Sequence, residues 1–421
     1  MSEVTAEQAG TPATEAAAHF VTRHGELTAA LRLAELAATS RGTILAETRG
    51  RAVLLRAQDY EAAVTVTCPA EPATAGRTCL DFAELKQTLA AAAAGEPKRA
   101  AAESPVTIDG AQLSTAQLSV PLSAYCVDTF PVPPPTAPPA ATVEGPAFFR
   151  ELARVLPAVG VDPAEPAHTM VRVELSGTLL RLASTDRYRI ALADLPAQPW
   201  DTADAVPTRT ALLPTRVLAK VVKQLSTYAG PVALGITADE AAPLVALTIG
   251  ATEVTIHATS AAAFPSPDTH MPTERHHAVT IDRASMLRAA RKAQALTGTR
   301  KAQAGTGGYQ FVVIRWDHEG AVTLAPWYGP QEQARVRGGS VTSEVKDGAA
   351  ADLSGRALLL TGRFLLNALD AFASQTVTLH LATAEATGLY LSPVLFTETD
   401  AITGQGYRHL IKPALVDWPP A

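Results

Sequence analysis

The sequence is poor in features that would place it in several common protein classes. Of its 421 residues only three are cysteines, Cys68, Cys79 and Cys126, and they show no CxxC spacing. This usage disfavours a disulfide framework or a cysteine-based metal site, and it fits a reducing, cytoplasmic compartment best. No run of about eighteen apolar residues occurs, so we expect no membrane-spanning helix.

An excess of basic charge is also missing, because 35 Lys and Arg residues stand against 41 Asp and Glu residues, a net charge of −6. This balance excludes a protein coated in positive charge but leaves room for a basic surface on one face. Residues 1–17 lack the basic start and apolar centre of a signal peptide, and their polar, Ala-rich composition predicts a disordered tail.

What the sequence does contain is a pattern that occurs three times. A glycine is followed by an alternating apolar run and then by a polar break, as GRAVLLRAQD from Gly50, GTLLRLASTD from Gly177 and, more weakly, GAVTLAPWYG from Gly320. Each copy lies between two helical patterns and near short β-like runs. A chain of this length fits two or three domains. We therefore predict an α+β fold of three similar domains, each with two helices and antiparallel sheets.

The helical patterns and the composition of the joints set the predicted boundaries. The six helices are expected within residues 25–37, 80–94, 145–159, 212–226, 282–296 and 358–373. A Pro-rich stretch marks the first joint as an extended linker. The predicted parts are the tail (1–17), domain 1 (18–130), the linker (131–144), domain 2 (145–272) and domain 3 (273–421).

Basic residues gather on one side of several of these helices. A single cationic stripe is usually only a solvated face. Several stripes in equivalent places of a repeat, within an acidic chain, indicate a basic surface suited to sequence-independent contacts with DNA phosphates. The candidate DNA-facing residues are Arg32, Lys86, Arg150, Arg154, Arg216, Lys220, Lys223, Arg288, Arg291 and Lys292.

The segment STDRYRIA (184–191) interrupts an apolar strand pattern with charged and aromatic residues. Taken alone, this stretch fits two interpretations equally well. It is either part of a binding site or a polar strand end in which Asp186 caps a turn.

Other segments make STDRYRIA more informative, because together they resemble the β subunit of bacterial DNA polymerase III, the sliding clamp. That family carries ATD-x-x-R-L-A in its middle domain, which STDRYRIA resembles, and Y-x-x-L-x-M-P-x-R at its C-terminus, which YRHLIKPALV (407–416) resembles. FPSPDTHMP (264–272) is similar to the family's FP…LP joint. The resemblance covers residues 18–416 and indicates a divergent, actinobacterial-type member or paralogue.

The resemblance implies a DNA-clamp fold assembled as a head-to-tail homodimeric ring, with helices facing duplex DNA and sheets outside. It implies a non-catalytic processivity factor in DNA replication, with no cofactor. Its implied partners are double-stranded DNA, the DNA polymerase III α subunit, the clamp loader and other proteins with clamp-binding motifs. The residues themselves agree, since we find no paired acid and base for an active site and no metal-ligand spacing.

In the family, the ATD strand and the C-terminal tail form a hydrophobic pocket that receives a short peptide from polymerase and other partners. Carried over to this chain, the resemblance implies a pocket between domains 2 and 3. Its residues would be His168, Thr185, Arg187, Tyr188, Arg189, Ile190, Pro265, His270, Phe364, Val394, Leu410, Ile411, Lys412 and Pro413.

Several positions depart from the family pattern. Lys412 replaces the usual Met of the tail, Leu415 replaces an Arg, and His270 takes the place of an apolar residue in the joint. A charge in an apolar groove is costly unless it is paired or exposed. These departures keep a second hypothesis open, namely a divergent clamp paralogue that acts as a regulatory, resistance or interaction module without replicative clamp activity.

Overall fold

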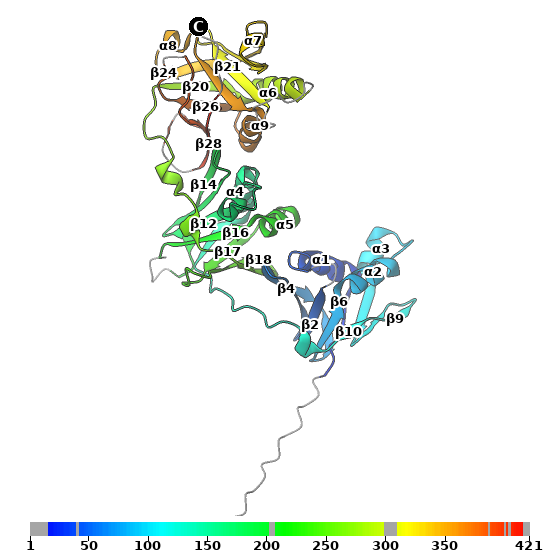
Figure 1. Cartoon of the computed structure of the whole chain (residues 1–421). Helices are drawn as coiled ribbons and strands as arrows, with labels where there is room; N and C mark the ends of the chain where they lie inside the picture. The colour runs from blue at the N-terminus through cyan, green and yellow to red at the C-terminus, as the bar shows by residue number, and fades with distance from the viewer. Residues whose placement is uncertain are drawn as a thin grey trace, which may run out of the picture. The chain divides into compact units, whose positions relative to one another are not determined.

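The computed structural model describes residues 16–38, 42–201, 207–298, 310–385, 388–399, 401–402 and 406–415, without the side chains of 72–74. Most of the predicted tail and the last six residues of predicted domain 3 therefore lie outside the described residues. The chain divides into two compact units (Figure 1). Unit 1 comprises Met1–Thr136 and Ala246–His257, and unit 2 comprises Ala137–Val245 and Ala258–Ala421.

Within the described residues, unit 1 contains three α-helices and two sets of antiparallel strands. Its helices are α1 (His24–Ala34), α2 (Phe82–Ala92) and α3 (Lys98–Glu103). Its strands are β1 (His19–Arg23), β2 (Thr43–Arg49), β3 (Ala52–Gln58), β4 (Ala62–Pro69), β5 (Glu71–Thr74), β6 (Arg77–Asp81), β7 (Pro105–Asp109), β8 (Gln112–Ser114), β9 (Ser119–Pro121), β10 (Ala124–Tyr125) and β19 (Thr252–His257). The strand orders are β5-β1-β7-β8-β9 and β10-β6-β2-β3-β4-β19.

Unit 2 contains most elements of the other two sequence repeats. Its helices are α4 (Gly145–Val155), α5 (Thr215–Leu225), α6 (Arg283–Gly298), α7 (Pro330–Gln333), α8 (Ala350–Leu353) and α9 (Gly362–Ala371). Its strands up to residue 245 are β11 (Ala141–Glu144), β12 (Met170–Ser176), β13 (Leu179–Thr185), β14 (Arg189–Pro196), β15 (Gln198–Pro199), β16 (Arg209–Pro214) and β17 (Pro231–Ile236), while β18 (Leu244–Ile249) begins here and continues into unit 1.

The later strands of unit 2 are β20 (His277–Asp282), β21 (Phe311–Trp316), β22 (Val322–Pro326), β23 (Gly339–Val341), β24 (Ser343–Asp347), β25 (Ala357–Thr361), β26 (Thr376–Leu381), β27 (Val394–Thr397) and β28 (Tyr407–Ile411). A nine-stranded sheet runs β16-β12-β13-β14-β28-β27-β26-β20-β24, and a four-stranded sheet runs β23-β22-β21-β25. Helix α4 packs on α5, and α6 packs on α9 (Figure 1).

The six predicted helices are present, although three of them begin later than the periodicity indicated. The apolar residues at 80, 212–213 and 358–360 extend β6, β16 and β25, because they pair with the neighbouring strands β2, β12 and β21. The chain passes from each of these strands directly into α2, α5 or α9. A short apolar run before a helix does not distinguish a buried strand end from another helical turn.

Two of the predicted domain boundaries differ from the limits of the compact units. Residues 141–144, predicted as the end of the linker, form β11 and pair with β17, with the alternating Ala141 and Val143 buried. Residues 246–257 cluster with unit 1, although the repeat assigns them to the second domain. The division into three domains stays a prediction.

The same strand pairing occurs once in each unit. In unit 1, β19 pairs antiparallel with β4, with Val254 opposite Val64. In unit 2, β28 pairs antiparallel with β14, with Leu410 opposite Ile190. In both cases the third strand after the second main helix of one repeat (α5 or α9) adds to the fourth strand of the repeat before it (β4 or β14). We call these two pairings the first joint (β4 with β19) and the second joint (β14 with β28).

Candidate functional site

At the second joint, the three adjacent strands β14, β28 and β27 share one apolar face. Leu410 of β28 lies opposite Ile190 of β14 and opposite Leu395 of β27, so all three side chains share a face. These residues form a buried cluster against which Met271 and Ile402 also pack. The face provides an apolar floor beside the STDRYRIA turn.

The turn that follows β13 is held by its own polar side chains. Thr185 Oγ1 donates to the carbonyl of Arg189 at 2.7 Å, and Asp186 Oδ1 accepts from the backbone N–H of Tyr188 at 3.1 Å. Arg187 has φ of +75°, and among the described residues it alone combines a positive φ with a side chain. Such a conformation costs on the order of 1–3 kcal/mol. The interpretation as a polar strand end therefore holds locally, because Asp186 caps the turn.

Arg189 anchors the turn to the rest of unit 2. Its Nε donates to Asp186 Oδ2 at 2.8 Å, its Nη2 donates to the carbonyl of Pro157, and its guanidinium lies 4.4 Å over the ring of Phe364. Arg189 is 4% exposed, and burial lowers its pKa while Asp186 opposes that shift. Its Nη1 is buried and has no hydrogen-bond partner among the described residues.

A cavity of about 560 Å³ opens over this floor. Its lining residues are His168, Thr185, Arg187, Tyr188, Arg189, Ile190, Pro265, His270, Pro393, Leu410 and Lys412. A smaller cavity of about 250 Å³ adjoins it, because Tyr188 and Lys412 line both. The smaller cavity is otherwise lined by Phe311, Thr361, Phe364, Pro413, Ala414 and Leu415.

Most of the predicted pocket residues meet at these two cavities. Ten line the larger one, and Phe364 and Pro413 line the smaller one. The structure does not place Val394 or Ile411 at either cavity. They lie opposite each other in the β27–β28 pair, on the other face of the sheet from Leu395 and Leu410. Pro393 lines the cavity instead. Because side chains alternate between the two faces along a strand, the position next to Val394 could have been identified from the sequence as the one that faces the cavity.

The predicted DNA-facing residues differ in how their charge is used. Arg154 is the clearest departure, because its side chain is only 10% exposed and pairs with Glu151 and Glu398 at 3.1 Å each. It also lies 5.3 Å over the ring of Tyr407. Arg154 therefore packs inside unit 2 and is not a free surface cation.

Three more of these cations are exposed but paired. Lys86 pairs with Glu35, Arg150 pairs with Glu151 at 2.9 Å, and Arg291 pairs with Asp370 at 2.9 Å. Exposed pairs of this kind leave little net charge for a distant phosphate. Arg216 is exposed and Lys220 half-buried. Four further exposed cations have no ion pair within the described ranges, namely Arg32, Lys223, Arg288 and Lys292.

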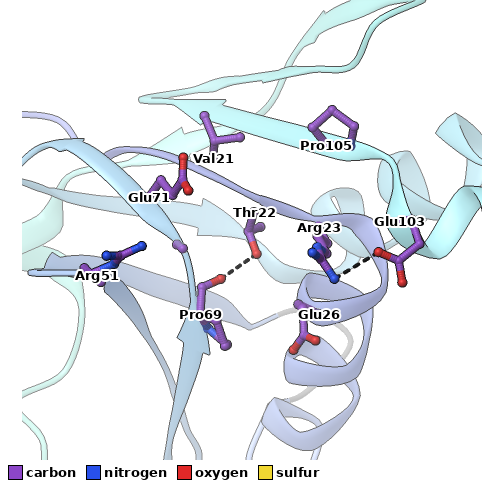
Figure 2. A pocket seen from close by; sticks show the side chains of 10 residues that line it. Val21, Thr22, Arg23, Glu26, Arg51, Pro69, Glu71, Glu103 and Pro105 are labelled. Carbon is purple, nitrogen blue, oxygen red and sulfur yellow. Dashed lines mark hydrogen bonds and ion pairs between the residues drawn. The ribbon is translucent and has the colours of Figure 1, made fainter.

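A third cavity, of about 460 Å³, lies in unit 1 and was not predicted from the sequence (Figure 2). Arg23 pairs with Glu103 at 2.9 Å on one side of it, and Thr22 donates to the carbonyl of Pro69 at 2.7 Å (Figure 2). Glu26, Glu71 and Arg51 also line it. Its two arginines stand against three glutamates, so the lining carries a slight excess of negative charge.

Within the ranges that the structure describes, no group of three or more His, Cys, Asp and Glu residues is placed to hold a metal ion. No helix in those ranges has the length and apolar character needed to cross a bilayer. Cys68 is buried, and burial raises the pKa of its thiol to about 11, so it is a poor nucleophile.

The chain is similar to known proteins in sequence and in structure. It is 28% identical over 239 residues to a beta sliding clamp of Micrococcus luteus, which covers 56% of this chain and 72% of that protein. It is 31% identical over 105 residues to the beta sliding clamp homolog GriR of Streptomyces muensis, which covers 25% of this chain and 27% of that protein. No protein-family model matches the chain.

The fold is that of solved sliding clamps. The DNA polymerase sliding clamp of Bacillus subtilis superposes with a TM-score of 0.75 at 14% identity, covering 95% of this chain and 100% of the other. The match includes the helices and antiparallel sheets described above. The chain therefore has the α+β clamp fold of bacterial DNA polymerase III β subunits and is a divergent relative of the beta sliding clamps.

Proposed function

We propose that this chain is a DNA sliding clamp, a non-catalytic processivity factor in the cytoplasm that encircles duplex DNA as a head-to-tail homodimer. In this role a clamp loader places it on DNA, and its second-joint cavity binds short peptides of the DNA polymerase III α subunit and other partners. The observation that carries the proposal is the repeated joint.

Both joints add the third strand after α5 or α9 to the fourth strand of the preceding repeat. The chain has three repeats, so within the described residues the third strand after α2 and the fourth strand of the last repeat are left without such a partner. These are β9 and β23, which end the β5-β1-β7-β8-β9 and β23-β22-β21-β25 sheets. An exposed edge strand is a template for pairing with another chain. Two copies that pair β9 with β23 twice satisfy every joint and close.

The charge of the chain supports loose rather than tight contact with DNA. The net charge is −6, and within the described ranges the exposed cations Arg32, Lys223, Arg288 and Lys292, on α1, α5 and α6, have no ion pair. A ring is held on DNA by topology, so weak and sequence-independent phosphate contacts are sufficient. Strong binding would hinder sliding.

A second candidate function is a divergent clamp paralogue that acts as a regulatory, resistance or interaction module without replicative clamp activity. Two observations favour it: the internal pairing of several helix cations, Arg154 above all, and the cationic residues at the cavity. The similarity to a clamp homolog, GriR, is in keeping with it.

Retention on circular DNA distinguishes the two candidates. The labelled full-length chain is incubated with nicked circular duplex, clamp loader and ATP, and DNA-bound protein is separated by gel filtration. A sliding clamp stays with circles and is lost when one restriction cut makes them linear. A chain that loader never retains on circles supports the paralogue instead.

The edge of β23 provides a matched pair of variants. Ser340 is exposed and lies opposite Thr323 in the β22–β23 pair. Ser340→Pro should block strand addition and abolish retention on circles, because proline interrupts a sheet edge. Ser340→Ala should be retained like the unmodified chain. Equal retention of both variants would contradict the proposed closure.

A further inference from the structure

We propose that the second-joint cavity selects peptides in which a carboxylate lies next to apolar side chains, and that Lys412 together with the arginines of the turn determines this preference. The proposal rests on the proposed function only in taking a peptide as the occupant. The acidic preference is read from the charges, burial and backbone of this chain.

The first argument is the charge of the lining. Among its eleven lining residues the cavity has Arg187, Arg189 and Lys412 as cations and His168 and His270 as imidazoles, but no Asp or Glu. Two carboxylates, those of Glu165 and Asp162, approach Arg187 at 3.4 and 3.9 Å, but neither lines the cavity. An anionic group entering the cavity therefore meets positive charge without a competing lining acid.

The second argument is an unfilled buried donor. Arg189 is 4% exposed, and two of its three nitrogens are fixed by Asp186 and the carbonyl of Pro157. Its Nη1 is buried and donates to nothing within the described part of the chain. A buried donor without an acceptor is unfavourable, and a hydrogen bond to a charged acceptor gains the most from filling it.

The third argument concerns the two cations at the mouth of the cavity. Lys412 is exposed, and its ammonium makes no ion pair or hydrogen bond with the described residues. Its backbone N–H donates to the carbonyl of Tyr188, and this hydrogen bond holds the segment after β28 against the STDRYRIA turn. Arg187 occupies a strained backbone conformation at the same mouth. Strain retained at a cavity is typical of a functional position.

The apolar part of the lining identifies the rest of the occupant. Ile190, Leu410, Pro265 and Pro393 form walls that suit aliphatic or aromatic side chains. The adjoining smaller cavity, reached past Tyr188 and Lys412, extends the same groove. A linear peptide with apolar side chains for the walls and a carboxylate for the cations fits both features.

The first experiment uses a displayed library of random octapeptides as the probe. The full-length chain and its Lys412→Met variant are each used to select binders, and the bound peptides are sequenced. We expect Asp and Glu to be enriched at least several-fold over the input by the unmodified chain, beside Leu, Ile or Phe. The Lys412→Met variant should select apolar peptides with much weaker acidic enrichment.

The second experiment measures affinity by fluorescence anisotropy. The most enriched peptide and its Asp→Asn form are titrated with the chain at low and high salt. We expect the acidic form to bind about tenfold more tightly, and only its affinity to fall strongly with salt. Lys98→Met, an exposed lysine on α3 of unit 1, is the matched control and should keep the full ratio.

The outcomes separate the two proposals. Selection of apolar peptides without acidic residues, or equal binding of the Asp and Asn forms, overturns the acidic preference but leaves peptide binding intact. Selection of no peptide by the unmodified chain overturns the acidic preference and also the peptide-tethering part of the proposed function. Retention on DNA circles is unaffected by either result.

Discussion

The two joints of this chain share a framework but differ in what they carry. In each joint a seven-residue strand, β3 or β13, follows a positive-φ glycine, Gly50 or Gly177. The strand leads into a turn in which an aspartate accepts backbone hydrogen bonds. Asp59 plays this role in the first joint and Asp186 in the second. The fourth strand of the earlier repeat, β4 or β14, then pairs with the third strand after α5 or α9.

The residues after the aspartate differ. The first joint continues with Tyr60, which is fully exposed, and Ala62 begins β4. The second joint has Arg187 with positive φ at the position of Tyr60, and Arg189 begins β14 at the position of Ala62. The cavity at the second joint is lined by three cations and no carboxylate, whereas the cavity that Pro69 of β4 lines in unit 1 has two arginines and three glutamates. The repeat thus provides a structural joint, and substitutions on it give the second joint a cavity whose lining is cationic.

The largest expected difference between the joints follows from their aspartates. Asp186→Ala should lower the free energy of unfolding by about 3–5 kcal/mol, because it leaves the buried Arg189 guanidinium without its counter-charge. Asp59→Ala removes two turn hydrogen bonds and should cost about 1 kcal/mol. Urea unfolding of both variants measures this, and equal losses would contradict the distinction.

A pH dependence should also belong to the second joint. His409 of β28 is buried next to Tyr407, and burial lowers the pKa of its imidazole from the ordinary 6.5 to about 3. Below pH 6.5 the unfolded chain binds a proton at this residue while the folded chain does not, so stability falls as pH falls toward 3. Between pH 7 and 5 the loss should be about 2 kcal/mol.

The control for this prediction is the variant His409→Gln, which has no imidazole to titrate. Its unfolding free energy, measured by urea at each pH, should lack this contribution, so the difference between the two profiles isolates it. Parallel profiles between pH 7 and 5 would show that His409 is accessible to protons in the folded chain.

The shared framework predicts equal effects at the two glycines. Gly50 and Gly177 have φ of +58° and +55°, and a Cβ at either position would meet no heavy atom within 4 Å. Gly50→Ala and Gly177→Ala should therefore each cost about 1 kcal/mol from backbone strain alone. Thermal or urea unfolding that finds one variant much less stable than the other would break the equivalence of the joints.

The smallest expected effect on the free energy of unfolding has opposite signs at Arg187 and Tyr60, which occupy equivalent positions in the two joints. Arg187→Gly should stabilise the chain by about 1 kcal/mol, because glycine adopts positive φ without strain and the exposed pairs of Arg187 contribute little. Tyr60→Gly should destabilise by up to about 1 kcal/mol, because Tyr60 has no positive φ to relieve. Urea unfolding of the two variants decides it, and a destabilised Arg187→Gly would contradict the strain argument.

Much of this architecture follows from the sequence. The repeat of Gly50 and Gly177 indicated the equivalent hairpins, and the helical patterns located the six main helices. The meeting of the STDRYRIA turn with the tail residues Leu410 and Lys412 came from the family resemblance. Periodicity alone could not place it, since segments more than 200 residues apart meet only through the β14–β28 pairing.

Some expected positions differ from the geometry for physical reasons. The family resemblance implies that Val394 and Ile411 line the pocket, but strand alternation turns them to the face opposite Leu395 and Leu410. Arg154 fits the pattern of a basic helix stripe. In the structure, however, it forms ion pairs with Glu151, one turn earlier, and with Glu398, far along the chain. A distant partner such as Glu398 leaves no local signal in the sequence.

The mass of the chain in solution tests most directly whether the joint is repeated a third time between two copies. Multi-angle light scattering over a range of concentrations measures it without DNA or partners. Pairing of β9 with β23 at both ends predicts a closed species of twice the 43.9 kDa of one chain, with nothing larger. A species of 43.9 kDa at every concentration, or an open series of larger assemblies, would contradict the account.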